Sequence, residues 1–188
     1  MSNPSSFSDQ VRESANRIAE SGAAALTGLY DLTSMRLVRF SVSITRNQHD
    51  AEDAVQATLV RVVGNALLLS RAESPWPYLL QMVRNESLVI LRRRRRRSIV
   101  SNLTDLLTHR SVDEIEKEES HRAVWLAIRS LPVEQREVVV LKIWEELTFS
   151  QIAEVLSIPP ATAASRYRYA MQKLACDLQS QSVEAYRG

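Results

Sequence analysis

Apolar residues recur at intervals of three and four along most of the chain, a period typical of amphipathic helices. The clearest case spans residues 51–67, where the apolar positions are Val55, Leu59, Val62, Val63, Ala66 and Leu67. Asp50 stands where the N-cap of this helix is expected, and Glu52 and Asp53 fall in its first turn, where the helix dipole favours acidic side chains. The pattern therefore predicts an amphipathic helix directly after Asp50.

Two further helices are predicted in the first half of the chain. Residues 29–44 form a plausible partner helix, with apolar residues at Leu29, Leu32, Leu37, Phe40 and Ile44. Two prolines in the segment 74–77 then interrupt the chain. A helix from Tyr78 turns Leu79, Met82, Val83 and Ile90 inward and ends in six consecutive arginines, Arg92–Arg97.

The second half of the chain predicts four shorter helical stretches. One covers residues 121–130, and the next begins at Leu131-Pro132, because proline is tolerated in a first helical turn. Thr148 and Gln151 match the capping box that opens a helix, and Pro159-Pro160 ends that helix. The last helix buries Ala163, Tyr167, Ala170 and Leu174. A short helix, a turn and a longer helix are typical of a helix-turn-helix motif, although any helical hairpin has a similar pattern.

These elements predict an all-α fold with two small helical domains joined by a flexible linker. Residues 1–22 are Ser-rich and are expected to form a weakly ordered tail. The first domain covers 23–97, an acidic linker covers 98–118, the helix-turn-helix domain covers 119–180, and 181–188 form a C-terminal tail.

Composition narrows the function classes. A hydrophobic content of 45% and a charged content of 24% are ordinary for a soluble globular protein. The single cysteine, Cys176, excludes an internal disulfide framework and favours a cytoplasmic protein. The sequence contains no metal-ligand spacing, no catalytic constellation and no apolar run long enough to span a membrane. We therefore expect no enzyme activity, no cofactor, no metal and no membrane insertion.

The charge distribution indicates a nucleic-acid partner. Residues 1–97 carry 14 arginines against 9 acidic residues, a net charge of +5, whereas residues 98–188 carry a net charge of −3. The six adjacent arginines have two interpretations, a charge run exposed to solvent or a patch that neutralises DNA phosphates. Six arginines without an intervening acidic residue favour the second interpretation. Trp76 and Tyr78, just before the basic helix, are either core aromatics or platforms on which unpaired bases stack.

The start of the last helix carries the side chains that would read DNA. Small residues at Ala161, Ala163 and Ala164 allow a close approach to the major groove. Thr162, Ser165, Arg166 and Arg168 offer hydroxyl and guanidinium donors at exposed positions.

Four motifs in sequence resemble extracytoplasmic-function (ECF) sigma factors of the sigma-70 family. Residues 50–56 resemble the D-A-E-D-x-V-Q signature of region 2, and residues 76–85 are similar to W-L-x-x-I-A-R-N. Residues 131–138 resemble L-P-x-x-x-R-x-V at the start of region 4, and residues 147–156 resemble L-S-x-x-E-I-A-E-I-L. The resemblance covers roughly residues 26–178, with both domains in the family's order.

The resemblance implies a promoter-reading subunit of RNA polymerase. Its partners would be core polymerase, through the β′ clamp helices and the β flap, promoter DNA and an anti-sigma factor. It places polymerase docking on Asp50, Glu52, Asp53 and Gln56. It places recognition and melting of the −10 element on Trp76, Tyr78, Arg84, Asn85, Arg92 and Arg93. It places −35 recognition on Thr162, Ala164, Ser165, Arg166, Arg168 and Tyr169.

The sequence departs from the family pattern in region 4 more than elsewhere. Ser157 and Ala161 stand where glycine is usual, and Ala164 replaces a lysine of the recognition helix. In region 2, Val89 stands where aspartate is common. Two alternatives therefore stay open: a degenerate sigma-like interaction protein, and a helix-turn-helix regulator that acts without core polymerase. The second leaves residues 50–56 and the arginines unexplained.

Overall fold

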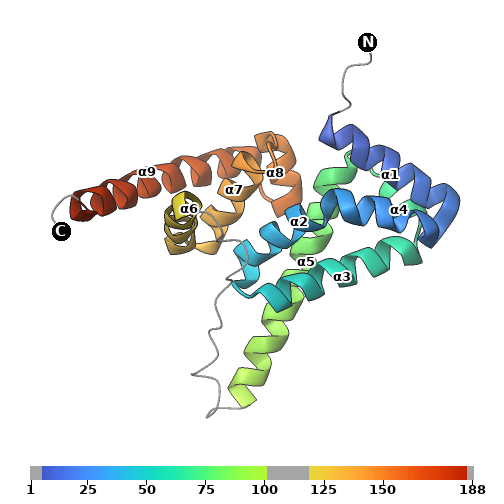
Figure 1. Ribbon diagram of the computed structural model, residues 1–188, viewed down its shortest axis with the longest axis horizontal. Coiled ribbons are helices and arrows are strands. Elements are labelled where there is room, and N and C mark those ends of the chain that lie inside the picture. Colours follow the sequence, from blue (N-terminus) through green and yellow to red (C-terminus); the bar gives the residue numbers. More distant parts are fainter. Residues whose placement is uncertain (1–5, 101–118, 186–188) are drawn as a thin grey trace. The chain divides into compact units, whose positions relative to one another are not determined.

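The computed structural model describes residues 6–100 and 119–185, with side chains for 6–96 and 124–177. The chain divides into two compact units, residues 1–108 and 109–188. Every regular element in the described ranges is a helix, so the predicted all-α fold is confirmed (Figure 1). No helix of the described part is long and apolar enough to cross a membrane.

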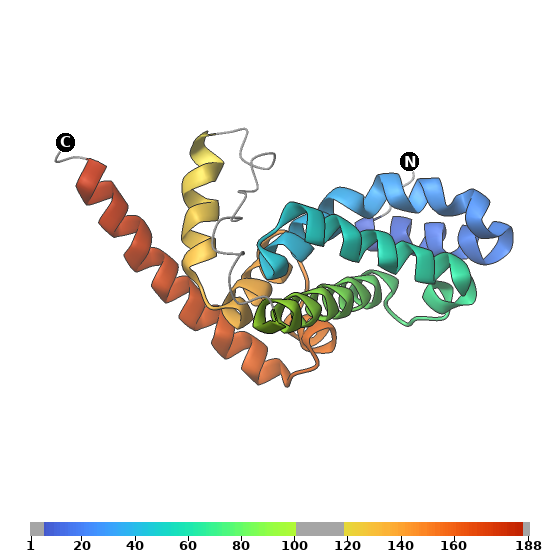
Figure 2. The ribbon, with the colours of Figure 1, turned by 90° about the horizontal axis from the view of Figure 1, so that it is seen from below.

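Unit 1 is a bundle in which α2, α3 and α5 pack on one another and α1 covers one end (Figures 1 and 2). Its elements are α1 (Phe7–Ser21), the 3₁₀ turn η1 (Gly22–Ala25), α2 (Leu26–Thr45), α3 (Gln48–Gly64), α4 (Leu67–Ser70) and α5 (Pro75–Val100). The fully buried side chains Leu37, Phe40, Val62, Leu79 and Val83 form its core. A buried hydrogen bond of 2.7 Å between the Ser41 and Ser87 hydroxyls joins α2 to α5.

The N-terminal segment contradicts the predicted tail at residues 1–22. Residues 7–21 form α1, which begins with a capping box in which Ser6 accepts from the Asp9 N–H and the Asp9 carboxylate accepts from the Ser6 N–H. Val11, Ala15 and Ile18 recur at helical spacing and are completely buried. This apolar stripe, hidden among serines and charged residues, makes α1 part of the core.

The start of α3 also differs from the prediction. The helix begins at Gln48, and its N-cap is Asn47, whose side chain accepts from the Asp50 N–H at 2.9 Å. The expectation of an N-cap at Asp50 is therefore wrong, and Asp50 lies in the first helical turn. An asparagine three residues earlier supplies the acceptor that the helix end needs.

The helix α5 is longer than the sequence pattern indicated. It begins at Pro75, where a missing N–H has no cost, and continues through the arginines to Val100. The predicted linker at 98–118 therefore overlaps the end of α5, and residues 101–118 lie outside the described residues.

Unit 2 packs α6 (Glu119–Ser130), α7 (Val133–Ile143) and α8 (Phe149–Leu156) around the long α9 (Pro160–Ala185). Its core includes Ala127, Ile128, Leu131, Val139, Ala170 and Leu174. The stacked rings of Trp125 and Trp144 flank this core, with centroids 5.0 Å apart. Because α9 extends to Ala185, the predicted tail at 181–188 begins inside a helix.

The helix-turn-helix region follows the predicted pattern closely. The capping box at Thr148 and Gln151 is present, so the predicted start of α8 is confirmed. Three residues, 157–159, connect α8 to α9. Ser157 ends α8 in the left-handed region, with φ of 56°, at the position where glycine is usual.

Candidate docking groove and nucleic-acid interface

An open groove of ≈ 590 Å³ lies between α2 and α3 in unit 1. Residues from successive turns of α2 form one wall: Leu26, Tyr30, Ser34 and Val38. The other wall comes from α3: His49, Glu52, Asp53, Val55, Gln56, Leu59 and Val60. Tyr30 and Val60 are 51% and 66% exposed, large apolar side chains held at the surface. Such exposed apolar residues beside a groove are typical of protein-binding sites.

The electrostatic character of the groove is acidic. Glu52 and Asp53 are exposed, and no lysine or arginine is among the described residues that line the groove. The Glu52 carboxylate accepts from the Gln48 amide at 2.7 Å, and His49 Nε2 lies 3.8 Å from Asp53 Oδ2. An apolar groove with an acidic rim suits a helix that carries apolar and basic side chains.

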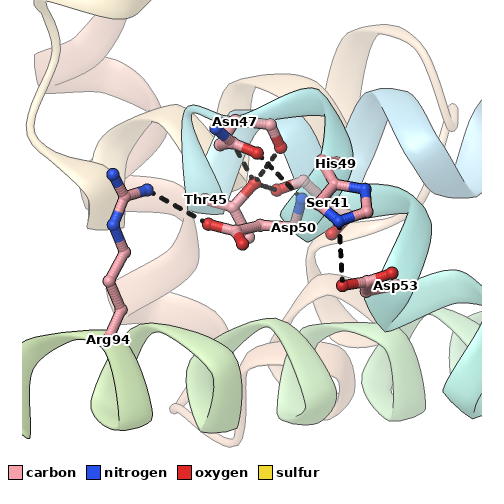
Figure 3. Close-up of polar contacts among 7 residues, drawn as sticks. All are labelled: Ser41, Thr45, Asn47, His49, Asp50, Asp53 and Arg94. Atoms are coloured by element: carbon pink, nitrogen blue, oxygen red, sulfur yellow. Dashed lines mark hydrogen bonds and ion pairs between the residues drawn. The ribbon is translucent and has the colours of Figure 1, made fainter. Parts of the chain in front are cut away.

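The four residues predicted for polymerase docking separate into two groups. Glu52, Asp53 and Gln56 line the groove, whereas Asp50 does not. Arg94 Nη1 on α5 donates to Asp50 Oδ2 at 3.2 Å. Figure 3 shows the Asp50 carboxylate turned toward Arg94 and the Asp53 carboxylate turned toward His49.

The residues predicted for the −10 element lie along α5. Tyr78, Asn85 and Arg92 are separated by seven residues each, so they follow one face of the helix. Asn85 and Arg92 are exposed, and Tyr78 is half-buried. Arg84 is half-buried and Arg93 is exposed. The five described side chains Arg92–Arg96, which we call the arginine tract, are all exposed.

Trp76 is a core side chain in this structure. Its indole is only 1% exposed, and the Phe7 ring of α1 meets it edge-on at 4.9 Å. The Arg36 guanidinium lies 3.9 Å from the Phe7 ring centroid and 5.8 Å from that of Trp76. Of the two interpretations, core aromatic and stacking platform, the burial supports the first, and the indole does not reach the surface where a base could stack.

The residues predicted for −35 recognition lie in the first three turns of α9. The opposite face is buried at Ala163, Ala170 and Leu174, as the pattern predicted, whereas Tyr167, the fourth residue of the predicted stripe, is only half-buried. Arg168 and Tyr169 are exposed, and the Arg168 guanidinium lies 5.2 Å from the Tyr169 ring centroid. Thr162, Ala164, Ser165 and Arg166 are half-buried, and the Ser165 hydroxyl donates to the Thr162 carbonyl at 3.0 Å.

The sequence reasoning missed the apolar half of the groove and the partner of Asp50. Leu26, Tyr30, Ser34 and Val38 follow one another at intervals of four, so a second, weaker stripe on α2 was a usable signal. No pattern within a single helix identifies the contact of Arg94 with Asp50, because it joins residues 44 positions apart.

Comparisons with known proteins agree on one family. The model for sigma-70 region 2 matches residues 29–97, and the model for sigma-70 region 4 matches residues 121–174. The ECF RNA polymerase sigma factor SigL of Mycobacterium tuberculosis is 29% identical over 173 residues, which cover 88% of this chain and 95% of that protein. The RNA polymerase sigma-E factor of Streptomyces avermitilis is 27% identical over 150 residues, 79% of this chain and 82% of that protein. The solved sigma factor RpoE, in complex with the anti-sigma factor NepR from Bartonella quintana, has the same fold, with a TM-score of 0.65 at 22% identity over 80% of this chain and 94% of that chain.

Proposed function

Because the chain belongs to the ECF group of the sigma-70 family, and is an RNA polymerase sigma factor, we propose that its two units divide promoter recognition between them. Unit 1 docks on the β′ clamp helices of core polymerase through the α2–α3 groove and contacts the −10 element through α5. Unit 2 contacts the β flap and reads the −35 element through α9.

The observation that carries the docking proposal is the composition of the groove. Tyr30 and Val60 offer exposed apolar surface, and Glu52 and Asp53 place negative charge beside it. A polymerase helix would lay its apolar side chains in the groove and direct its basic side chains at these carboxylates. The apolar contacts would supply most of the affinity, and the charges would mainly set the association rate and the orientation.

The −10 contacts are assigned to the exposed face of α5. Asn85 and Arg92 follow Tyr78 on this face, and the arginine tract continues it. Arginines bind backbone phosphates without reading sequence, whereas Tyr78 and Asn85 can stack on bases or donate to them. Trp76 would then support α5 from within the core and would not touch DNA.

The −35 contacts are assigned to the start of α9. Arg168 is exposed and can bind a guanine with two hydrogen bonds, whereas the half-buried Arg166 is better placed for phosphate. Thr162, Ser165 and Tyr169 would add polar contacts beside them.

A second candidate function is a degenerate sigma-like protein that binds its partners without reading promoters. Ala164 favours it, because the family's recognition helix has a lysine at this position. In either case we propose an anti-sigma factor as a further partner, because two solved proteins of similar fold, CnrH and RpoE, are in complex with CnrY and with the anti-sigma factor NepR.

The docking proposal is tested by the affinity of the full-length chain for core polymerase. Tyr30→Ala should weaken binding about 30-fold or more, because a central aromatic anchor contributes ~2 kcal/mol or more to an interface. Met35→Ala is the matched control, since Met35 is 81% exposed on the same helix and does not line the groove. Equal affinities for the two variants would remove the groove from the docking surface. Promoter-directed transcription by the wild-type holoenzyme then separates a working sigma factor from the degenerate alternative.

A further inference from the structure

Helical spacing selects one arginine of the tract for a separate role. Arg94 follows Ser87 by seven residues and Val83 by eleven, so it continues the face of α5 that these two completely buried residues occupy. Arg92 is exposed and continues the opposite face of α5, on which Tyr78 is half-buried and Asn85 is exposed. Arg94 therefore extends toward α3, where its guanidinium meets Asp50 at 3.2 Å.

The backbone at Asp50 is held by hydrogen bonds within the turn between α2 and α3. The Asp50 N–H donates to the Asn47 side chain at 2.9 Å, and the Asn47 carbonyl accepts from the Thr45 hydroxyl at 3.0 Å (Figure 3). Thr45 is itself buried. Asp50 also lies in the first turn of α3, where the helix dipole favours a negative charge. The turn between α2 and α3 thus fixes the backbone position from which the Asp50 carboxylate reaches Arg94.

A second ion pair between the same helices has the opposite polarity. Arg61 Nη1 near the end of α3 lies 2.6 Å from Glu86 Oε1 on α5. Together the two pairs fasten α5 to both ends of α3. Within the described side chains, Arg94 is the member of the arginine tract that forms an ion pair with another helix.

The like charges of the arginine tract destabilise the end of α5 on which they lie. Arginines three and four positions apart, such as Arg92 and Arg96, repel one another. An acidic group beside the tract offsets part of this repulsion. It also holds the last turns of α5 against the start of α3, and with them the direction in which the remaining arginines extend.

We propose that Asp50 is a positioning residue for DNA binding: it holds Arg94, and with it the arginine tract, on the start of α3. The other arginines are thereby turned toward the DNA phosphates. The proposal rests on the proposed function, in that the tract contacts DNA. It assigns Asp50 a role other than polymerase docking.

The substitution Asp50→Asn changes the affinity for DNA in opposite directions if Asp50 positions the tract and if it acts only through its charge. Removing a negative charge near DNA should strengthen binding if only long-range charge matters, and should release Arg94 for one more phosphate. If Asp50 positions the tract, the same change should weaken binding to a short random-sequence duplex between about 1.5- and 5-fold, the range equivalent to an exposed ion pair. It should also make the dependence of affinity on salt shallower, because fewer phosphates are contacted.

The experiment measures duplex binding and core-polymerase binding by the full-length chain over a range of salt concentrations. Asp53→Asn is the matched control: it makes the same charge change on the same helix, but its side chain lines the groove. Asp50→Asn should weaken duplex binding and leave core-polymerase binding unchanged. Asp53→Asn should weaken core-polymerase binding and leave duplex binding unchanged. In an Arg94→Gln background the effect of Asp50→Asn should disappear, whereas in an Arg95→Gln background it should persist.

Several results would overturn the proposal. One is stronger duplex binding by Asp50→Asn. A second is an equal effect of Asp50→Asn on duplex binding in the Arg94→Gln and Arg95→Gln backgrounds. A third is loss of core-polymerase binding by Asp50→Asn. If Asp53→Asn leaves core binding unchanged, the Asp53 carboxylate does not contribute to docking affinity, and Tyr30→Ala still tests the groove. The proposal for Asp50 is then decided by its coupling to Arg94. Should Asp50→Asn lower the melting temperature of unit 1, Asp50→Glu, which keeps the charge, should restore duplex binding. Failure of that rescue would also reject the proposal.

Discussion

The helix α1 is expected to be an integral part of the unit 1 core, and Ile18→Ala tests this directly. The Ile18 side chain is completely buried, together with Val11 and Ala15 on the same stripe. Truncating a fully buried isoleucine removes apolar surface and leaves a cavity, at a cost of ~2–5 kcal/mol. For a domain of this size, a loss of ~3 kcal/mol lowers the melting temperature by about 12–24 °C.

Urea unfolding followed by circular dichroism and tryptophan fluorescence measures this loss. Unit 1 contains Trp76, whose ring contacts Phe7 of α1, and unit 2 contains Trp125 and Trp144. The data should be fitted with separate transitions for the two units if the probes do not coincide. Asn16→Ala, at an exposed position of the same helix, should change the free energy of unfolding by less than about 0.5 kcal/mol. If Ile18→Ala is equally neutral, α1 does not belong to the core, and a weakly ordered tail is the better description.

Two further predictions concern unit 2. Arg168→Ala should reduce the base preference at one −35 position by ~1–3 kcal/mol, whereas Arg166→Ala should weaken binding to all sequences about equally. Both effects are measured by binding of the holoenzyme to single-base variants of a selected promoter. If neither variant changes binding, the degenerate sigma-like alternative is favoured. Glu146→Gly should raise the free energy of unfolding by about 1 kcal/mol in thermal melts, because Glu146 has a left-handed φ of 55° that glycine adopts without strain. Glu134→Gly, in the first turn of α7, should instead destabilise the unit by a similar amount, and a stabilising effect there would contradict this explanation.

The fold was predictable where local sequence signals and tertiary packing agree. The capping box at Thr148 is confirmed, and so is the buried stripe of α9 except at Tyr167, which is half-buried, because both signals depend on residues within one helix. The tail prediction failed because the surrounding serines and charges masked a stripe of only three apolar residues in α1. The predicted start of α3 failed because Asn47 and Asp50 are both good caps, and the chain uses the earlier one.

The candidate site was predictable only in part. The acidic positions Glu52 and Asp53 were found from their motif, but their apolar neighbour Tyr30 comes from another helix, and only the packing of α2 on α3 brings them together. Asp50 and Asp53 belong to the same motif, so the family resemblance assigned both of them to polymerase docking. Their different neighbours, Arg94 for Asp50 and His49 for Asp53, are a property of the tertiary structure.

The helix α3 connects the two proposed activities of unit 1, because its faces have different partners. One face, with Glu52, Asp53 and Gln56, lines the groove, and Asp50 and Arg61 pair with α5. The buried residues Ala51, Ala54 and Val62 hold the helix in the core between these surfaces. Polymerase bound in the groove would therefore leave the ion pairs to α5 intact, and DNA bound along the arginine tract would leave the groove free. The proposed polymerase surface on α2 and α3 and the proposed DNA surface on α5 would therefore be separate, and unit 1 could bind both partners at the same time.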